Sequence, residues 1–308
     1  MAASCATARG AESQRGFIVI AVLWILAAVT ALVLIYLTYV INTAIVVASS
    51  TDRIQAEAMV SAGLELAALQ LSGYSEAARP SSGTFNARVG AGRVFVSFRS
   101  EAARIDLNAA SKQLLSGLMA GLGASPFDAA VYADRILAWR TPTGLGDSDP
   151  ETSFYKTSGL AYAPRHAPFP AAEELGLVYG IPSALVERML PFVTVFSNMA
   201  QVNILDAEPQ VLAALPGMTP IMLQAVVSQR SDPALDPHAL IGMVGGEGAT
   251  IASSKAYRVV VDTELPDGRR RSSEIVILLL EAGDEPYCVL SWRNNSDGST
   301  VSQRAALR

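Results

Sequence analysis

The most restrictive feature of this sequence is an apolar stretch close to its amino terminus. No charged residue occurs from Phe17 to Thr51, and the segment 17–40 contains neither proline nor glycine. A helix rises about 1.5 Å per residue, so about 20 apolar residues cross the hydrocarbon core of a membrane. The sequence therefore predicts that residues 17–40 span a membrane as one helix.

Helical spacing continues beyond this span. Apolar residues recur three and four positions apart in the more polar segment that follows, as at Leu64, Ala68 and Leu71. One long helix is therefore predicted over residues 17–75, with its first half in lipid and its second half packed on a soluble body.

The apolar stretch is not typical of a secretory signal peptide. Such a peptide has an apolar core of about 7–15 residues and a small-residue cleavage site, whereas this core is longer and no such site follows soon. Residues 1–16 instead form a polar leader that ends Gln14-Arg15-Gly16, directly before Phe17. This junction resembles a prepilin-type signal, in which a prepilin peptidase cuts after the glycine and methylates the new N-terminal phenylalanine. The alternative is an ordinary single-pass anchor with the same junction residues.

The charge and the cysteine content of the chain exclude some classes of function. The formal charge of the chain is −5, and removing the leader, with its net +1, leaves −6. An acidic body is a poor polyanion binder overall. Arg9 and Arg15 precede the helix, so we expect a cytoplasmic N-terminus, an inner-membrane anchor and a periplasmic body. The two cysteines are Cys5 and Cys288, so the chain without its leader has no intrachain disulfide and no cysteine metal site.

Strand-like patterns occur in two groups separated by a long interior. The runs 84–89 and 93–98 flank a short glycine-bearing link and predict a hairpin, and three more runs lie near the end of the chain, at 257–265, 273–280 and 287–292. This division predicts one antiparallel sheet interrupted by an insertion. We assign the sheet to residues 76–103 and 252–293, the inserted domain to 104–251 and a flexible tail to 294–308.

The interior contains an internal repeat. Residues 105–118 align without gaps on residues 202–215, at an offset of 97, and each copy runs into a second helical pattern. Asn108 and Ala109 in the first copy, and Asp206 in the second, are candidate helix N-caps. The repeat predicts an all-α domain of two helix-hairpin-helix or SAM-like units.

The order of motifs resembles that of the K-type minor pseudopilins of the type II secretion system (the general secretion pathway protein K family). The matching segments are the Arg15-Gly16-Phe17 junction, residues 104–110, 138–140, 162–169, 173–175, 190–195 and 202–203. The resemblance implies an α+β fold, in which a pilin-like N-terminal helix packs on an antiparallel sheet that carries a large helical insertion. It also implies a subunit that caps the pseudopilus tip on I-type and J-type partners, helping to initiate pseudopilus assembly and the export of folded proteins across the outer membrane.

The fifth residue after the predicted cleavage site is Ala21. Most pilins carry a glutamate there, which pairs with the amine of a neighbouring subunit in the apolar filament core. An unpaired charge in that core would be costly. A tip subunit has no neighbour beyond it, so Ala21 fits that place, while the Phe17 amine remains available to the subunit below.

The alternative function is DNA binding by a membrane-anchored protein of a competence or DNA-uptake system. The segment from Val202 to Met218 resembles a helix-hairpin-helix, whose glycine-bearing turn lets backbone N–H groups approach phosphates. Such binding needs nearby cations, yet residues 201–229 contain no lysine or arginine and the first copy offers only Lys112. We therefore expect no nucleic-acid partner.

No catalytic residues are predicted, because phosphate loops, HExxH helices and nucleophile elbows are absent from the sequence. The protein is therefore expected not to be an enzyme. One acidic loop is a candidate metal site: Asp147, Asp149 and Glu151 lie within five residues of one another, after Gly144 and Gly146. Closely spaced carboxylates suit Ca²⁺, so calcium is the one cofactor we consider. The alternative is a solvated loop with an aspartate N-cap.

Overall fold

The computed structural model describes the chain except for residues 1–12, 144–148, 231, 233–235, 284 and 296–308. Most of the expected leader and tail, and Asp147, therefore lie outside the described residues. The chain divides into two compact units, Met1–Ala58 and Met59–Arg308.

The first helix, α1, runs from Ser13 to Ser72 and belongs to both units. It begins before Phe17, so the predicted cleavage junction lies within helical backbone. Its segment Ile18–Thr43 has a mean hydropathy of 3.1 and is not buried in the protein. Length and composition fit a single-pass membrane anchor.

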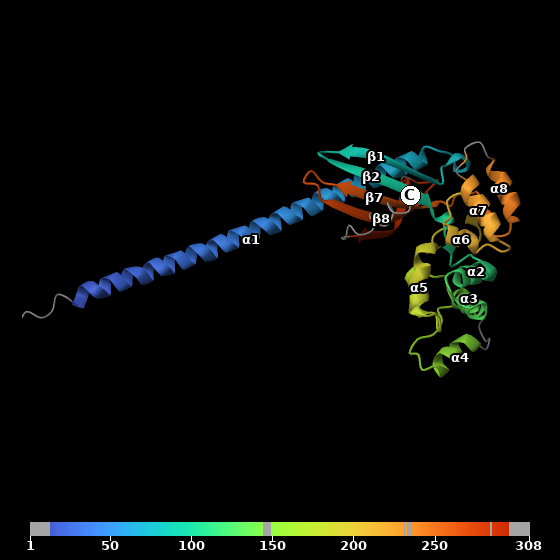
Figure 1. The fold of residues 1–308 in the computed structure, drawn as a ribbon, viewed down its shortest axis with the longest axis horizontal. Helices are drawn as coiled ribbons and strands as arrows, with labels where there is room; N and C mark the ends of the chain where they lie inside the picture. Colours follow the sequence, from blue (N-terminus) through green and yellow to red (C-terminus); the bar gives the residue numbers. More distant parts are fainter. Residues whose placement is uncertain (1–12, 144–148, 231, 233–235, 284, 296–308) are drawn as a thin grey trace, which may run out of the picture. The chain divides into compact units, whose positions relative to one another are not determined.

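The second unit contains one five-stranded sheet (Figure 1). Its strands lie in the order β1-β2-β7-β8-β9, and every neighbouring pair is antiparallel. The bounds are β1 Ser82–Val89, β2 Gly92–Ser100, β7 Ala256–Glu264, β8 Arg270–Leu279 and β9 Tyr287–Asn295. Residues 294 and 295, expected in the tail, are therefore the end of β9.

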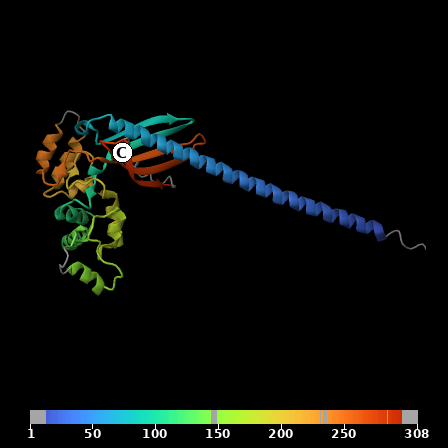
Figure 2. The same ribbon diagram turned by 180° about the vertical axis from the view of Figure 1, so that it is seen from behind.

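The last turns of α1 cover one face of this sheet, as Figure 2 shows for the part that belongs to the second unit. Alternation along β2 buries Val94, Val96 and Phe98, which pack with Leu64 and Leu71 of α1. Gly63 permits the close approach, because a Cβ there would lie 2.8 Å from a methyl carbon of Val261. The mixed fold of N-terminal helix and antiparallel sheet is thus organised by one shared core.

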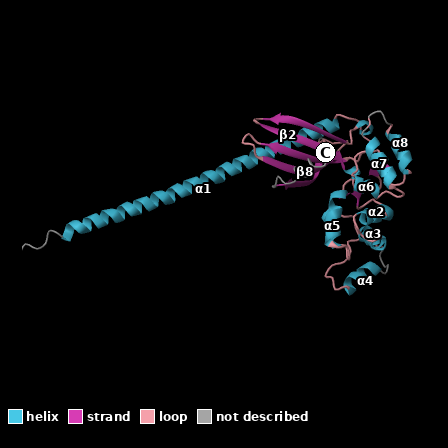
Figure 3. Cartoon of the chain, viewed as in Figure 1, coloured by secondary structure: helices cyan, strands magenta, loops and turns pink. Residues whose placement is uncertain are grey.

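Between β2 and β7 the chain is mainly helical (Figure 3). Its elements are η2 Glu101–Ala103, β3 Ile105–Asp106, α2 Lys112–Gly121, α3 Pro126–Arg140, α4 Pro150–Thr157, η3 Ala172–Leu177, α5 Ser183–Met189, η4 Leu190–Phe192, β4 Val193–Thr194, β5 Val202–Asn203, α6 Pro209–Ala213, α7 Pro220–Gln229, α8 Pro237–Val244 and β6 Ala249–Thr250. These elements enclose a second core, which includes Leu115, Ile136, Trp139 and Leu212.

The internal repeat corresponds to two similarly built units. Each begins with a two-residue strand, β3 or β5, continues through a helical hairpin, α2–α3 or α6–α7, and ends with a parallel partner strand, β4 or β6. Asp106 and Asn203 occupy equivalent positions, and each side chain accepts a hydrogen bond from the backbone N–H two residues later. This turn leads the chain from the short strand toward its hairpin.

The predicted helix caps were wrong. Ser111 caps α2 by accepting from the Leu114 N–H, and α6 follows Glu208 without a side-chain cap. Asn108 instead exchanges two hydrogen bonds with the backbone of Phe169, and Asp206 accepts from the Ser82 hydroxyl. The helices begin later than expected because the Asp106 and Asn203 turns occupy the preceding residues.

Candidate functional sites

The predicted processing and assembly residues lie at the start of α1. Gly16, Phe17 and Ala21 are all helical. Farther along, Thr30 and Thr43 donate their hydroxyls to the carbonyls of Leu26 and Tyr39, at 2.7 and 2.8 Å. These hydroxyls are satisfied within the helix, as a lipid environment requires.

The two hairpins have glycines at the tips expected for helix-hairpin-helix units. Gly123 and Gly217 have φ values of 99° and 76°, in the left-handed region that favours glycine. Basic side chains near them are few: Lys112 pairs with Asp134 at 2.7 Å, and Arg188 lies beside Gly123. Sequence reasoning missed Arg188, which reaches the first hairpin from α5.

In each repeat, an arginine side chain donates hydrogen bonds to backbone carbonyl oxygens of the segment that precedes the hairpin. Arg140, at the end of α3, donates to the carbonyl oxygens of Leu107 and Ala110, and Arg230, after α7, donates to that of Ala207. Ala110 and Ala207 are equivalent at the repeat offset. These guanidinium groups are committed to backbone carbonyls, so their role here is structural.

The acidic loop is described from Asp149 onward. Asp149 caps α4, since one carboxylate oxygen accepts from the Glu151 N–H at 3.1 Å and the other lies 2.7 Å from Nε2 of His166. Burial raises the pKa of Asp149, but hydrogen bonds from Thr152 and His166 outweigh it, so the pKa is lowered. Asp149 therefore has protein partners without a metal.

Glu151 has a different environment. Its Oε1 atom is buried and has no hydrogen-bond partner among the described residues. Burial is the main cause that raises the pKa of this carboxyl group. An orphaned carboxylate oxygen fits a cation ligand, whereas the paired Asp149 fits one less well. Among the described residues, no group of three or more His, Cys, Asp or Glu side chains is placed to hold a metal. Asp147 lies outside the described part.

A buried charge network joins the sheet to the helical domain. Arg258 on β7 donates to both oxygens of Glu101, at 2.7 and 3.1 Å, and also pairs with Glu274 on β8. The Thr194 hydroxyl donates to Glu101 as well. A buried carboxylate needs such partners.

Comparisons with known proteins agree with this architecture. The family model described as type II secretion system (T2SS), protein K, matches residues 96–198, from β2 to just beyond β4. This segment is similar to the protein K family. The resemblance to K-type minor pseudopilins drawn from the sequence is thereby confirmed. No curated protein matches the chain.

A structural likeness accompanies this family match. A chain from the crystal structure of the GspK-GspI-GspJ complex of the enterotoxigenic Escherichia coli type 2 secretion system matches with a TM-score of 0.54 and 18% sequence identity. The match covers 79% of this chain and 95% of that chain. At this identity the likeness supports the fold, a mixed arrangement of an N-terminal helix, further helices and an antiparallel sheet.

In the sequence, Arg104 and Thr194 stand out only as members of the matching segments 104–110 and 190–195. The network they border was not predicted, because Glu101 and Arg258 lie 157 residues apart in sequence. The one local signal was a charged residue, Arg258, placed inside residues 256–261 of β7, which are otherwise apolar.

Proposed function

We propose that this chain is the K-type subunit that caps the tip of the type II secretion pseudopilus on I-type and J-type partners. In this role it helps to initiate assembly and thereby the export of folded proteins across the outer membrane. It acts as a structural component rather than an enzyme, anchored by one helix in the inner membrane, with a cytoplasmic N-terminus and a periplasmic body.

The observation that supports the tip position best is the helical domain between β2 and β7. A repeating filament brings the same surface of every subunit against its neighbours, so a large domain in each subunit would crowd the lattice. A single copy at the end meets no such restriction.

The N-terminal residues support the same position. Without a carboxylate at Ala21, the subunit cannot neutralise an amine from a subunit beyond it, whereas its own Phe17 amine can be neutralised from below. Removing one partner of a buried ion pair costs about 3–5 kcal/mol, which is enough to favour growth in one direction.

This proposal depends on processing by the prepilin peptidase. We propose cleavage between Gly16 and Phe17, followed by methylation of the Phe17 amine. Mass spectrometry of the membrane-extracted protein should find N-methylated phenylalanine first, and Gly16→Leu should block cleavage more than Gly16→Ala does. An intact Met1 would exclude prepilin-type processing.

Cysteine crosslinking tests the capping role. Single cysteines introduced along residues 20–40, in a chain with Cys288 replaced by serine, should trap I-type or J-type pseudopilins and give no homodimers. Ala21→Glu should leave the complex with those partners unchanged. Abundant self-crosslinks, or filaments of this protein alone, would identify a repeating subunit instead.

A further inference from the structure

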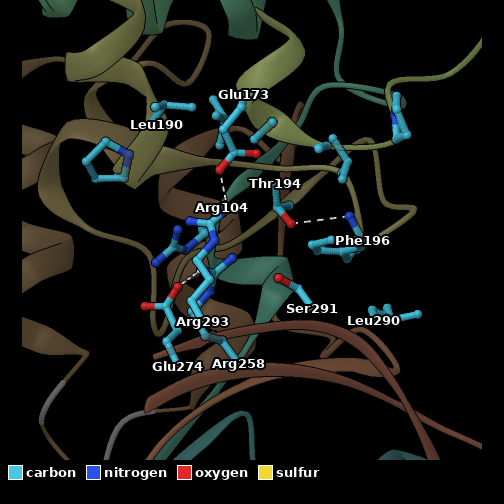
Figure 4. A pocket seen from close by; sticks show the side chains of 16 residues that line it. Arg104, Glu173, Leu190, Thr194, Phe196, Arg258, Glu274, Leu290, Ser291 and Arg293 are labelled. Atoms are coloured by element: carbon cyan, nitrogen blue, oxygen red, sulfur yellow. Dashed lines mark hydrogen bonds and ion pairs between the residues drawn. The ribbon is translucent and has the colours of Figure 1, made fainter. Parts of the chain in front are cut away.

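A cavity of about 380 Å³ lies where the sheet meets the helical domain. The sheet contributes Arg258, Glu274 and Arg293, while Arg104 and Glu173 come from the segment between β2 and β7 (Figure 4). Apolar side chains complete the wall, among them Leu190, Phe196 and Leu290. The cavity therefore combines charged groups with an apolar lining.

Two of its three arginines already have carboxylate partners. Arg258 is shared between Glu274 and the buried Glu101 behind it, and Arg293 pairs with Glu173. The side chains of Arg293 and Glu173 are 52% and 49% exposed, against 14% for Arg258, so the Arg293 pair is much more open to solvent than the Arg258 network.

Arg104 is the exception. No hydrogen bond or ion pair joins its guanidinium to any residue in the described part of the chain, although its backbone N–H donates to Glu101. Burial, followed by the charge of Arg258, lowers the pKa of Arg104 to about 10. The group stays protonated at neutral pH. The charges of Glu101, Glu274 and Glu208 oppose the lowering of its pKa, but none of these carboxylates forms an ion pair with it.

We propose that this cavity binds a carboxylate, held by the guanidinium of Arg104. A guanidinium presents a planar fork that matches the two oxygens of a carboxylate. Arg104 is the one arginine of this wall without an ion-pair partner among the described residues, so its guanidinium is free to receive one carboxylate. Glu173 and Glu274 in the same wall disfavour a dianion such as sulfate or hydrogen phosphate. The apolar wall at Leu190 and Phe196 suits the aliphatic part of the ligand.

The carboxylate has two possible sources with the same chemistry. It is either a free organic acid or the aspartate or glutamate side chain of a protein docked over the cavity. The second source rests on the proposed function, since the docked protein would then be a partner pseudopilin. The experiment separates the two sources.

The probe is sodium acetate, tested on the full chain in detergent against sodium chloride and sodium sulfate at equal ionic strength. Fluorescence of the buried Trp139 reports the thermal midpoint, and NMR of isotope-labelled acetate reports its affinity. Arg104→Lys keeps the charge but loses the fork. Arg99→Gln is the matched control, because Arg99 is half exposed and its carboxylate partner, Glu208, is 3.8 Å away.

Acetate should raise the midpoint of the unaltered protein and of Arg99→Gln more than either other salt does. In Arg104→Lys the acetate affinity should fall by about tenfold, because a lysine ammonium keeps the charge but cannot donate two parallel hydrogen bonds to the carboxylate. Equal effects of the three salts on the unaltered protein, or an undiminished acetate response in Arg104→Lys, would overturn the proposal.

The source of the carboxylate is then tested with the complex between this chain and a partner pseudopilin. If a partner side chain fills the cavity, acetate and Arg104→Lys should both weaken the complex while Arg99→Gln does not. If neither acetate nor Arg104→Lys changes the stability of the complex, the ligand of the cavity is a free carboxylate. If the unaltered chain forms no complex at all, the proposed function fails, while the acetate titration still decides whether the cavity binds a carboxylate.

Discussion

At the scale of single residues, the guanidinium of Arg258 forms ion pairs with two carboxylates, Glu101 and Glu274. Burial raises the pKa of Glu101, but the hydrogen bonds and charge of Arg258 outweigh it and hold the pKa below its ordinary value of 4.5. Glu101 therefore contributes stability that is present above about pH 4.5 and is lost as the pH falls through the lowered pKa.

Arg258→Met should reverse this dependence. Glu101 would then be buried without its main partner, so its pKa should rise above the unfolded value and the variant should lose about 3–5 kcal/mol at neutral pH. The loss should shrink as the pH falls toward about 4.5. Denaturant unfolding at several pH values, followed by Trp139 fluorescence, measures this.

The control is Arg99→Met, because Arg99 lies opposite Arg258 across the β2–β7 pair and is half exposed. Arg99→Met should change the free energy of unfolding very little at every pH tested. A loss in Arg258→Met that does not change with pH would show that Glu101 is not the group left unpaired.

At the scale of elements, the two repeats pack α2 against α6 through equivalent positions. A Cβ on Gly117 would lie 2.4 Å from the carbonyl oxygen of Ala214, and these residues are 97 apart, as the repeat offset requires. The contact is to backbone, which cannot move away as a flexible side chain can. The glycine therefore sets how closely the two units approach.

Gly117→Ala should destabilise the protein by about 1–3 kcal/mol, although alanine favours a helix by about 1 kcal/mol. Gly121→Ala in the same helix is the matched control, because a Cβ there meets nothing within 4 Å. The control should be neutral or stabilising in thermal unfolding. Equal midpoints for the two variants would contradict close packing at Gly117.

The acidic loop before and within α4 gives a prediction about calcium. If Glu151 holds Ca²⁺ together with Asp147 and Asp149, chelation should lower the thermal midpoint and Glu151→Gln should abolish that response. In chelator, Glu151→Gln should be at least as stable as the unaltered protein at neutral pH. The reason is that the raised pKa of Glu151 means that its charged form destabilises the fold as the pH rises above the unfolded value.

The preferred variant is Glu151→Gln because Asp149 also caps α4 and pairs with His166, so changing Asp149 would destabilise the loop with or without a metal. Equal midpoints of the unaltered protein in calcium and in chelator would reject the site.

Structural features that leave a repeating pattern in the sequence could be predicted from it, whereas single long-range contacts could not. Alternation at Val94, Val96 and Phe98 indicated a strand with one buried face, since burial imposes a period of two. The repeat indicated two similar helical units. The cavity around Arg104 and the network at Glu101 had no such signal, because their partners come from strands far away in sequence.

At the scale of the whole molecule, charge weighs against the DNA-uptake alternative. The hairpin tips have the glycines that phosphate binding would use, but Lys112 is paired with Asp134, and Arg140 and Arg230 are committed to carbonyl oxygens. The full chain in detergent should show no duplex DNA binding near physiological salt. Micromolar binding that weakens with salt and with Lys112→Ala or Arg188→Ala would favour the alternative.

In the sheet β2 and β7 are neighbours, although the helical domain separates them in sequence. The hydroxyl oxygens of Ser100 and Ser254, 154 residues apart, are 3.0 Å from each other. Closing an unfolded loop of that length costs roughly 4 kcal/mol in entropy, whereas a helical domain that folds first brings its own two ends together. The sheet should therefore form last. Until it does, the apolar side chains of α1 at Leu64 and Leu71 have no strands to cover them. A newly made chain is therefore most prone to aggregate in the interval before its helical domain folds.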